Sequence, residues 1–325
     1  MDNQKLVNEA KKVLSREDVT CLIGYGKEST GFRVSPLFVR TEEETDKLFF
    51  SPLCSLSLVN YLTLEKGVFL QGNKETGGEK IAIVARGCDS RALIQLIAER
   101  GIPREQLVIL GVPCRGTIDL KKIEAKFPGA RNCAEVTEAE GIYHIRFDNE
   151  PHEVPKEELL ADHCTRCAFP NPLVYDVLLE DPVEPKEAAY SDIEEMEKMA
   201  IEERQEYWKG KFARCLRCYA CRNACPLCYC DDCILERVAP PWVNRSVKLS
   251  ENLMFHLARG YHLAGRCAGC GECERVCPVN LPLMRLNRKL EKDIKDIFEY
   301  TAGTNPDEKP LLSSFNPKDP NHFIY

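Results

Sequence analysis

The chain lacks any run of apolar residues close to the roughly 20 that a membrane helix requires. Its first residues, Met1 to Gln4, are polar, so an apolar signal segment is also missing. From these two absences we expect a cytoplasmic protein with no membrane span. Basic residues are in deficit as well, because 44 Lys and Arg face 51 Asp and Glu for a net charge of −7. This balance disfavours nucleic acid as a partner.

The sequence patterns of several cofactor and catalytic sites are missing too. No Gly-x-Gly-x-x-Gly fingerprint follows an apolar strand, so a standard Rossmann dinucleotide site is not indicated. No P-loop, nucleophile triad or acid–base pair stands out. We therefore predict no catalytic residues in this chain, and its cysteines become the main candidates for function.

Cysteine is abundant, at 18 of 325 residues. In a cytosolic protein so many cysteines indicate metal binding rather than disulfides. Eight of them form two runs that share the spacing C-x2-C-x2-C-x3-C-P. The first run is Cys215, Cys218, Cys221 and Cys225, and the second is Cys267, Cys270, Cys273 and Cys277. Bacterial-type ferredoxins bind their clusters with runs of this kind.

The spacing of the two runs suits [4Fe-4S] clusters. A cubane requires four soft thiolates around one small volume, and two-residue spacers let one loop supply three of them. In two-cluster ferredoxins the fourth cysteine of each run binds the other cluster. We therefore predict one cluster on the first three cysteines of the first run plus Cys277, and another on the first three of the second run plus Cys225. Structural zinc is the competing interpretation, but it uses paired C-x2-C knuckles across a longer loop.

Charged residues beside the two runs differ in sign. Arg214, Arg217 and Arg222 crowd the first run, whereas Glu272 and Glu274 occupy the second. Positive charge stabilises a reduced cluster and raises its potential, and negative charge lowers it. The sequence therefore predicts the higher potential for the cluster on the first run.

A third [4Fe-4S] cluster is left open on four further cysteines. Cys164 and Cys167 form a C-x2-C pair, and Cys88 and Cys114 each lie in a Gly-flanked loop after a predicted strand. Loops after parallel strands meet at one edge of a sheet, which would bring these thiols together. The alternative is that Cys88 and Cys114 are buried residues of apolar character.

Other cysteines give weaker signals. Cys54 or Cys133 is able to replace one ligand of the third cluster. Cys228, Cys230 and Cys233 follow the first run directly. Their spacing leaves a further cluster, a zinc site and a loop-shaping role open.

The candidate cofactor-binding residues of the N-terminal half lie around Cys88 and Cys114. Asp89 and Arg91 flank Cys88, where they would contact a cofactor. The alternative for these two residues is an ion pair that stabilises the loop.

Apolar patterns predict an α/β N-terminal domain with a partly parallel sheet, followed by a mainly helical domain. Residues 81–85 and 107–112 are short apolar runs typical of buried strands, and 90–100 between them has helical spacing. Residues 252–263 and 281–300 also have helical spacing. The second domain is therefore predicted to be a helical, ferredoxin-type dicluster domain rather than a compact ferredoxin.

Shifts in composition divide the chain into four parts. We predict an α/β docking or cofactor domain over 1–182, an acidic linker helix over 183–209, the dicluster domain over 210–300 and a C-terminal tail over 301–325. Two prolines mark the start of the linker, and an acidic helical stretch follows them.

Two stretches resemble a known family. Residues 84–93, which contain Arg-Gly-Cys-Asp, and residues 111–116, Gly-Val-Pro-Cys-Arg-Gly, resemble the N-terminal domain of the coenzyme F(420) hydrogenase/dehydrogenase beta-subunit family. That family includes beta subunits of deazaflavin-linked hydrogenases and formate dehydrogenases. The extension 225–230 is similar to beta subunits of sulfhydrogenases and anaerobic sulfite reductases. Residues 255–267 resemble dicluster subunits of heterodisulfide-reductase-type complexes.

The resemblance implies a subunit that joins a catalytic partner to a flavin or a soluble electron carrier. The cysteine runs predict two [4Fe-4S] clusters as cofactors. Members of the family often hold FAD, so the resemblance adds FAD as an open possibility beside the third cluster. We expect a non-catalytic electron-transfer subunit of an anaerobic oxidoreductase complex, with a partner of hydrogenase, formate dehydrogenase or heterodisulfide-reductase type. One alternative is a flavin-containing reductase that itself acts on a deazaflavin or NAD(P). Another is a scaffold that only anchors clusters and partners.

Overall fold

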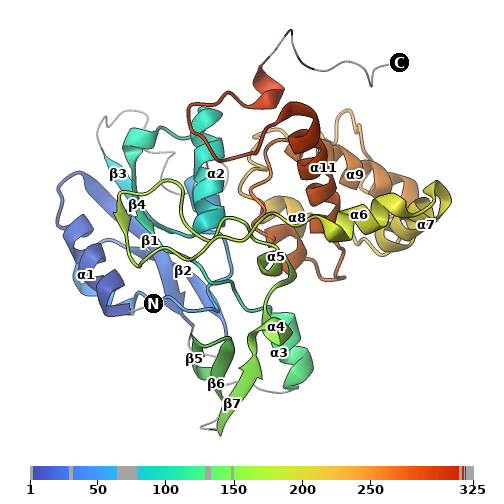
Figure 1. Ribbon diagram of the computed structural model, residues 1–325. Coiled ribbons are helices and arrows are strands. Elements are labelled where there is room, and N and C mark those ends of the chain that lie inside the picture. The colour runs from blue at the N-terminus through green and yellow to red at the C-terminus, as the bar shows by residue number, and fades with distance from the viewer. Residues whose placement is uncertain are drawn as a thin grey trace. The chain divides into compact units, whose positions relative to one another are not determined.

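The computed structural model describes residues 3–28, 32–63, 79–128, 133–147 and 150–314, together with 317 and 319. The chain divides into two compact units. Unit 1 consists of Met1–Val59, Phe69–Ser90 and Pro103–Ala188, and unit 2 of Asn60–Val68, Arg91–Ile102 and Ala189–Tyr325. The ribbon in Figure 1 runs from the N-terminal elements in blue to the C-terminal helices in red.

Unit 1 contains a five-stranded sheet with the strand order β2-β1-β3-β4-β8 (Figure 1). Its strands are β1 (Val19–Lys27), β2 (Val34–Val39), β3 (Lys80–Ala85), β4 (Leu107–Gly111) and β8 (Val177–Leu178). Strand β1 pairs antiparallel with β2, and the other neighbouring strands are parallel. Helix α2 (Gly87–Ala98) connects β3 to β4. The predicted strand–helix–strand unit and the partly parallel sheet are thus confirmed.

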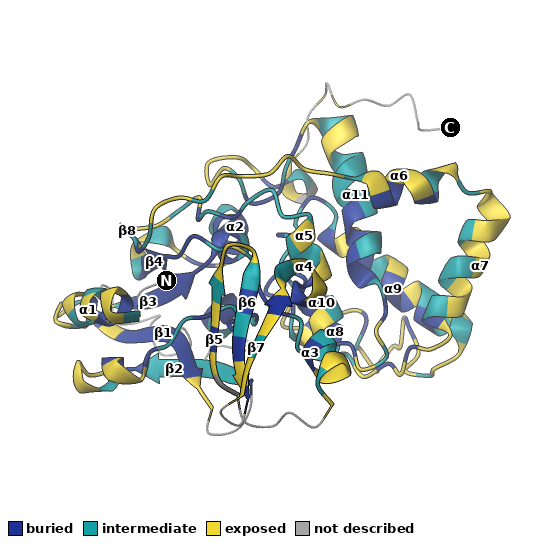
Figure 2. Cartoon of the chain, turned by 60° about the horizontal axis from the view of Figure 1, so that its bottom comes forward, coloured by how far each residue is buried: buried dark blue, intermediate teal, exposed yellow. Residues whose placement is uncertain are grey.

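The central strands form because their residues are apolar throughout rather than alternating. All residues of β4 and all but the first of β3 are buried, as expected for parallel strands covered on both faces (Figure 2). Helix α1 (Asn3–Leu14) buries one apolar side and has its last turn rich in lysine. The register pairs Ala85 with Gly111, so the segments after β3 and β4 leave the sheet at the same edge.

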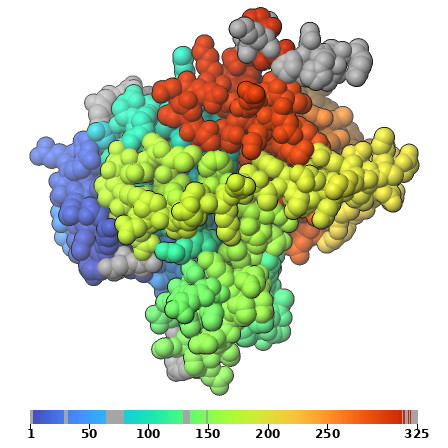
Figure 3. Space-filling view, in the orientation of Figure 1, coloured from blue at the N-terminus to red at the C-terminus, as the bar shows by residue number. Residues whose placement is uncertain are grey.

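A second sheet of unit 1 is antiparallel and has three strands, and the atoms of this part of the chain are green in Figure 3. They are β5 (Cys133–Ala139), β6 (Ile142–Phe147) and β7 (Glu150–Pro155), and the short helices α3 (Leu120–Lys126), α4 (Lys156–Leu159) and α5 (Asp162–Thr165) flank them in sequence. In β6 the side chains of Tyr143, Ile145 and Phe147 are buried and those between them are not. This alternation places one face of the sheet on a core shared with α3 and α4.

Unit 2 is mainly helical, and no strand occurs among its described residues. Its helices are α6 (Ser191–Lys198), α7 (Ile201–Phe212), α8 (Ala220–Asn223), α9 (Leu249–Leu263), α10 (Glu272–Arg275) and α11 (Leu283–Phe298), and the short 3-10 helices of the chain are η1 (Glu43–Lys47), η2 (Leu58–Leu62), η3 (Arg104–Gln106) and η4 (Leu311–Ser313). The helices predicted over 252–263 and 281–300 are confirmed. The core of this unit combines apolar side chains such as Phe212, Phe255 and Leu281 with cysteines of both runs.

The acidic segment 183–209 differs from the predicted linker. From Ala189 onward it belongs to unit 2, where it forms the separate helices α6 and α7. Asp192 is buried and pairs with Arg288 of α11 at 2.5 Å, and Glu197 pairs with Lys289 at 2.7 Å. The acidic residues therefore hold α6 on a basic stretch of α11, a complementarity that the acidic segment alone does not reveal.

Three further sequence predictions can be set beside the described residues. Unit 2 also takes Asn60–Val68 and Arg91–Ile102 from within the first 182 residues. The predicted tail 301–325 lies outside the described residues after 314, except for 317 and 319. Among the described residues, no helix has both the length and the apolar character needed to cross a membrane.

Candidate functional site

The two cysteine runs of unit 2 fold into loops with the same backbone conformation. In the first run Arg217 and Tyr219 have φ values of 52° and 58°, and in the second run Gly269 and Gly271 have 70° and 72°. A four-residue helix follows each loop, α8 in one case and α10 in the other. Left-handed backbone costs a non-glycine residue roughly 1 kcal/mol or more. The first run therefore adopts the loop shape of the second without the help of glycine.

Four cysteines from both runs line a single small cavity. These are Cys215, Cys218 and Cys221 of the first run with Cys277 of the second. Burial raises the pKa of Cys221 to about 11, with Arg259 opposing this effect and the neighbouring thiols of Cys215 and Cys277 adding to it. The structure thus brings together the four residues predicted to hold one cluster.

Three of the four cysteines of the second predicted set are also neighbours. Burial raises the pKa of the Cys273 thiol well above its usual range, Arg259 opposes this effect, and the thiols of Cys267 and Cys225 add to it. Cys225 likewise raises the pKa of Cys267, after burial as the main cause. The last cysteine of each run is therefore an electrostatic neighbour of the other run.

Hydrogen-bond donors surround these sulfurs in the way that metal-bound thiolates need. The backbone N–H of Arg217 donates to Cys215 Sγ at 3.4 Å, and that of Leu281 donates to Cys277 Sγ at 3.3 Å. The buried Nε atoms of Arg217 and Arg259 have no partner among the described residues. An unpartnered buried donor calls for an acceptor that the protein does not itself supply. Bound clusters with their sulfides would fit this donor set.

No three His, Cys, Asp or Glu side chains in the described ranges are arranged to hold a single metal ion. The ligands of a cubane each bind a different iron, so they stand farther apart than ligands of one ion. Of the three extra cysteines after the first run, Cys230 is exposed, whereas Cys228 and Cys233 are half-buried. Their predicted roles stay open.

Three separate segments of unit 1 meet around a second group of cysteines. Cys88 and Cys114 each lie three residues beyond the paired residues that end β3 and β4. Cys114 N donates to Pro170 O at 2.8 Å, which fixes the β4 loop to the segment that follows Cys167. Thr117 N donates to Cys164 Sγ at 3.4 Å.

Electrostatic effects indicate that the four thiols of this group are neighbours. Burial raises the pKa of Cys88, and the thiols of Cys114 and Cys167 raise it further. Burial also raises the pKa of Cys114, with Cys164 and Cys167 adding to the effect. Burial opposes ionisation of Cys164 as well, but His163 outweighs it and lowers the pKa of this thiol.

The fifth cysteine of this region, Cys54, is held differently. It is fully buried, its Sγ accepts from Ser51 N at 3.3 Å and it donates to Phe49 O at 3.8 Å. Both of these contacts are to the backbone of the segment around Cys54 itself. The side chain of Cys133, the other suggested substitute, lies outside the described residues.

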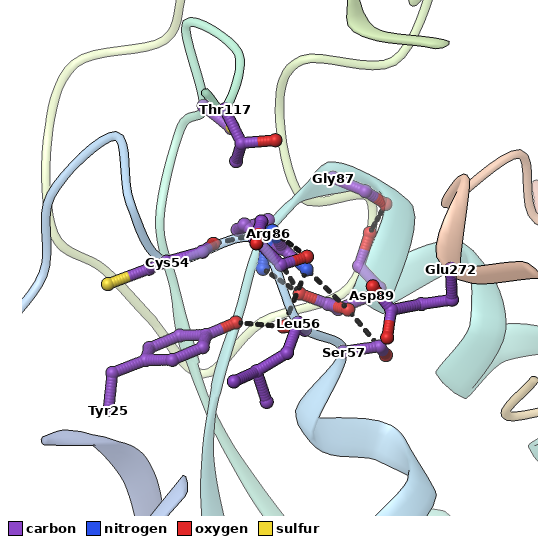
Figure 4. A network of polar contacts seen from close by, with 12 residues as sticks. Tyr25, Cys54, Leu56, Ser57, Arg86, Gly87, Asp89, Thr117 and Glu272 are labelled. Atoms are coloured by element: carbon purple, nitrogen blue, oxygen red, sulfur yellow. Dashed lines mark hydrogen bonds and ion pairs between the residues drawn. The ribbon is translucent and has the colours of Figure 1, made fainter. Parts of the chain in front are cut away.

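Cys88 lies in the first turn of α2 and not in a loop as the sequence predicted, and a buried arginine anchors this end of the helix (Figure 4). Arg86 donates to Cys54 O at 2.7 Å and to Leu56 O at 2.9 Å, and its Nε pairs with Asp89 at 2.7 Å. Ser57 Oγ donates to the other oxygen of Asp89 at 2.8 Å. Asp89 therefore has the ion-pair role that the sequence left as an alternative, and its partner is Arg86.

Unit 1 also contains a cavity of about 390 Å³ beside Cys114. The cations Lys27 and Arg115 line it together with Phe49 and Phe50. Acidic residues contribute as well, and they are Glu135, Glu138 and Glu180. The aromatic and cationic parts of this wall are suited to a flat, anionic ligand.

The sequence of the chain was compared with those of known proteins. No family model matches the chain. The F420-dependent formate dehydrogenase subunit beta of Methanocaldococcus jannaschii is 26% identical over 300 residues, which cover 74% of this chain and 78% of the relative. The chain is thus similar to the beta subunit of an F420-dependent formate dehydrogenase. The F420-dependent formate dehydrogenase 1 subunit beta of Methanococcus maripaludis is 23% identical over 299 residues, 73% of this chain and 76% of that one.

These relatives confirm the resemblance to the coenzyme F(420) hydrogenase/dehydrogenase beta-subunit family that the motifs suggested. A solved structure of the F420-reducing [NiFe] hydrogenase complex from Methanosarcina barkeri, derivatised with xenon, contains a chain with 12% identity and a TM-score of 0.41. The match covers 50% of this chain and 58% of that chain.

Arg91, a predicted cofactor contact, belongs to unit 2. Its guanidinium donates to Ala302 O at 2.8 Å and to Ala268 O at 3.2 Å, and it pairs with Glu291 at 3.4 Å. Ala268 directly follows Cys267, so Arg91 supports the loop of the second run. The distance in sequence between Arg91 and this loop hid the contact from sequence analysis.

The predicted difference in charge between the two runs is reduced by ion pairs that these residues form. Arg222 pairs with Glu236 at 3.2 Å, and Glu272 pairs with Arg275 at 2.7 Å. The higher potential expected for the first run stays a prediction. The sequence favours a core or surface histidine over a metal ligand at His256 and gives Arg259 no role, although the spacing of three residues on a helix between the runs was an available signal.

Proposed function

We propose that this chain is an iron–sulfur electron-transfer subunit of an oxidoreductase complex. The observation that carries the proposal is the cavity of unit 2 that four cysteines of both runs line. When bound there, [4Fe-4S] clusters accept and release single electrons. Similarity to beta subunits of F420-dependent formate dehydrogenases supports the same role.

In this proposal the chain's residues hold and orient two clusters in unit 2. One set consists of Cys215, Cys218, Cys221 and Cys277, and the other of Cys267, Cys270, Cys273 and Cys225. The N–H groups of Arg217 and Leu281 donate to ligand sulfurs and so stabilise negative charge on them. Most of these thiols are buried or half-buried, which limits their contact with water.

Unit 1 is proposed to exchange electrons with a soluble carrier. FAD would bind the cavity that Lys27, Arg115 and the two phenylalanines line, with the cations toward its phosphates. A third [4Fe-4S] cluster would bind Cys88, Cys114, Cys164 and Cys167. Cys114 belongs to both the cavity wall and the cysteine group, so the two proposed sites are adjacent.

The reaction itself is proposed to take place on a partner. Both curated relatives are named as beta subunits, which supports a separate catalytic subunit of formate dehydrogenase, hydrogenase or related type. A flavin in unit 1 would connect this relay to a two-electron carrier such as a deazaflavin.

Iron, sulfide and flavin content of the anaerobically purified chain tests the proposal. Three cubanes and one flavin require about twelve irons and one FAD per chain. About eight irons without flavin would support the two clusters proposed for unit 2 and contradict the third cluster and the FAD proposed for unit 1. Protein that takes up no iron after reconstitution with iron and sulfide would overturn the proposal.

The cavity in unit 1 also favours a second candidate, a reductase that acts on a deazaflavin or NAD(P) without a partner. The isolated, FAD-loaded chain would be mixed with reduced deazaflavin or NAD(P)H and a one-electron dye. Steady dye reduction that persists when Cys221→Ala and Cys273→Ala remove the clusters of unit 2 supports the reductase. Dye reduction that is lost in this variant supports the relay instead, because its electrons leave through those clusters.

A further inference from the structure

Helix α9 has a buried polar face, although it lies in the core of unit 2. Asn252, His256 and Arg259 follow each other at intervals of four and three residues, so they lie along one side of the helix. Their exposed fractions are 0%, 2% and 3%. The large apolar side chains Met254 and Leu257 of the same helix are exposed instead. Figure 2 shows α9 with dark blue and yellow segments in alternation.

All three polar side chains contact the first cysteine run. Asn252 Nδ2 donates to Cys215 O at 3.1 Å and to Phe212 O at 3.0 Å. His256 Nε2 lies 3.2 Å from Cys215 Sγ. Arg259 Nη2 donates to Cys221 O at 3.0 Å. The polar residues on the buried side of α9 are therefore explained by the loop that they face.

His256 reaches a sulfur that is a proposed cluster ligand. A ligand sulfur carries no proton, so the proton of this hydrogen bond must be on Nε2 and His256 must be the donor. The imidazole ring stacks on Phe212, with 4.4 Å between centroids and 11° between planes, which holds it in place. Hydrogen bonds to cluster sulfurs favour the reduced state, which is the more negative one.

Arg259 lies among cysteines of both proposed clusters. Its charge lowers the pKa of Cys221 in one set and of Cys273 in the other, against the raising effect of burial in each case. Burial opposes its own charge, but nearby cysteines, among them Cys225, hold the pKa of Arg259 well above its usual value. Its Nε atom is one of the two buried arginine donors without a partner in the described part of the chain.

We propose that the buried polar face of α9 sets the reduction potentials of the two clusters in unit 2. His256 raises the potential of the cluster on Cys215 alone, because it contacts only that cluster's ligand. Arg259 raises both potentials, because a cation in a water-poor interior acts on both neighbouring sites. Each couple takes up one electron and no proton. The two side chains act as positioning residues and do not ligate iron.

The proposal rests on the proposed function, since it needs loaded clusters, and variants of the full chain test it. Anaerobic redox titration with dithionite and EPR detection gives one midpoint potential per couple. For His256→Phe, which keeps the ring stacking and loses the donor, we expect one couple to fall by about 59 mV or more. That shift is a tenfold change in the ratio of reduced to oxidised cluster for one electron. His256→Gln, which regains a donor, should recover part of the shift.

For Arg259→Gln, which keeps a donor toward Cys221 O and loses the charge, we expect two couples to fall by similar amounts. Arg259→Lys keeps the charge and should leave both couples near their original potentials. The matched control is His262→Phe, the same substitution at an exposed position of the same helix, and no couple should move.

The number of couples that move decides the outcome. Unchanged potentials in iron-loaded His256→Phe protein, or a shift of one couple only in Arg259→Gln, would overturn the proposal. If His256→Phe protein does not load iron, His256→Ala removes the same donor without the larger ring. Failure of the original chain to bind about eight irons in unit 2 would instead count against the proposed function.

Discussion

The crossed assignment of the cysteines can be tested with pairs of substitutions. In the structure Cys277 of the second run shares a cavity with the first run, whereas Cys225 is a neighbour of Cys267 and Cys273. A variant that lacks two ligands of the same cluster should lose one intact cubane. A variant that lacks one ligand of each cluster should lose both cubanes, because each cubane needs four thiolates.

The decisive comparison is between two double variants that share Cys215→Ala. With Cys277→Ala as the second change, we expect one intact [4Fe-4S] cluster to be lost relative to the original chain. With Cys225→Ala instead, we expect two to be lost. Spin quantitation of the reduced protein by EPR, together with iron analysis, counts the remaining cubanes. Three-iron species, which form when one ligand is missing, have a distinct signal in the oxidised protein.

The two variants are matched controls for each other, since both remove two buried cysteines from the same region. If each run instead bound its own cluster, the results would be exchanged, with two cubanes lost for the pair with Cys277 and one for the pair with Cys225. That outcome would refute the crossed assignment and the reading of the cavity on which it depends.

Three further predictions concern stability and ligand binding. Arg86→Met should lower the free energy of unfolding by about 3–5 kcal/mol, because it leaves the buried carboxylate of Asp89 without its partner. An unchanged midpoint of urea unfolding would contradict this expectation. The control is Lys126→Met, which removes an exposed ion pair. Burial opposes the ionisation of Glu99, but Arg266 outweighs it and lowers the pKa of this carboxylate. The stability that Glu99 contributes should therefore be complete above the usual glutamate pKa of 4.5 and disappear as the pH falls below it, so the original chain and Glu99→Gln should differ at pH 7 and converge in acid. Thr137→Trp should fill the cavity of unit 1 and reduce FAD content without changing iron content, whereas equal flavin in both proteins would place the flavin elsewhere.

The elements that sequence predicted well are those whose patterns are local. The buried runs 81–85 and 107–112 became β3 and β4, because strands covered on both faces are apolar at every position. The same holds for α9 and α11, which have helical spacing over more than three turns. The acidic segment after 183 was predicted less well, since its meaning depends on Arg288 and Lys289, about a hundred residues later in the chain.

The candidate site shows the same division. The spacing of the eight cysteines already indicates cluster type, because the ligand loop is formed by neighbours in sequence. The surroundings of the sulfurs come from elsewhere in the chain: Arg91 supports the loop of the second run, and His256 contacts Cys215. Neither contact has a sequence signature, since both join residues more than forty positions apart.

The sequence by itself indicated the metal chemistry, the strands β3 and β4, the helices α9 and α11, and the family that the chain resembles. Tertiary structure decided which thiols are neighbours, that Asp89 pairs with Arg86, and that α9 turns its polar side inward. The physical reason is that ligand spacing and periodicity are properties of adjacent residues. The burial of a charge and the direction of a hydrogen bond exist only after distant segments have packed against each other.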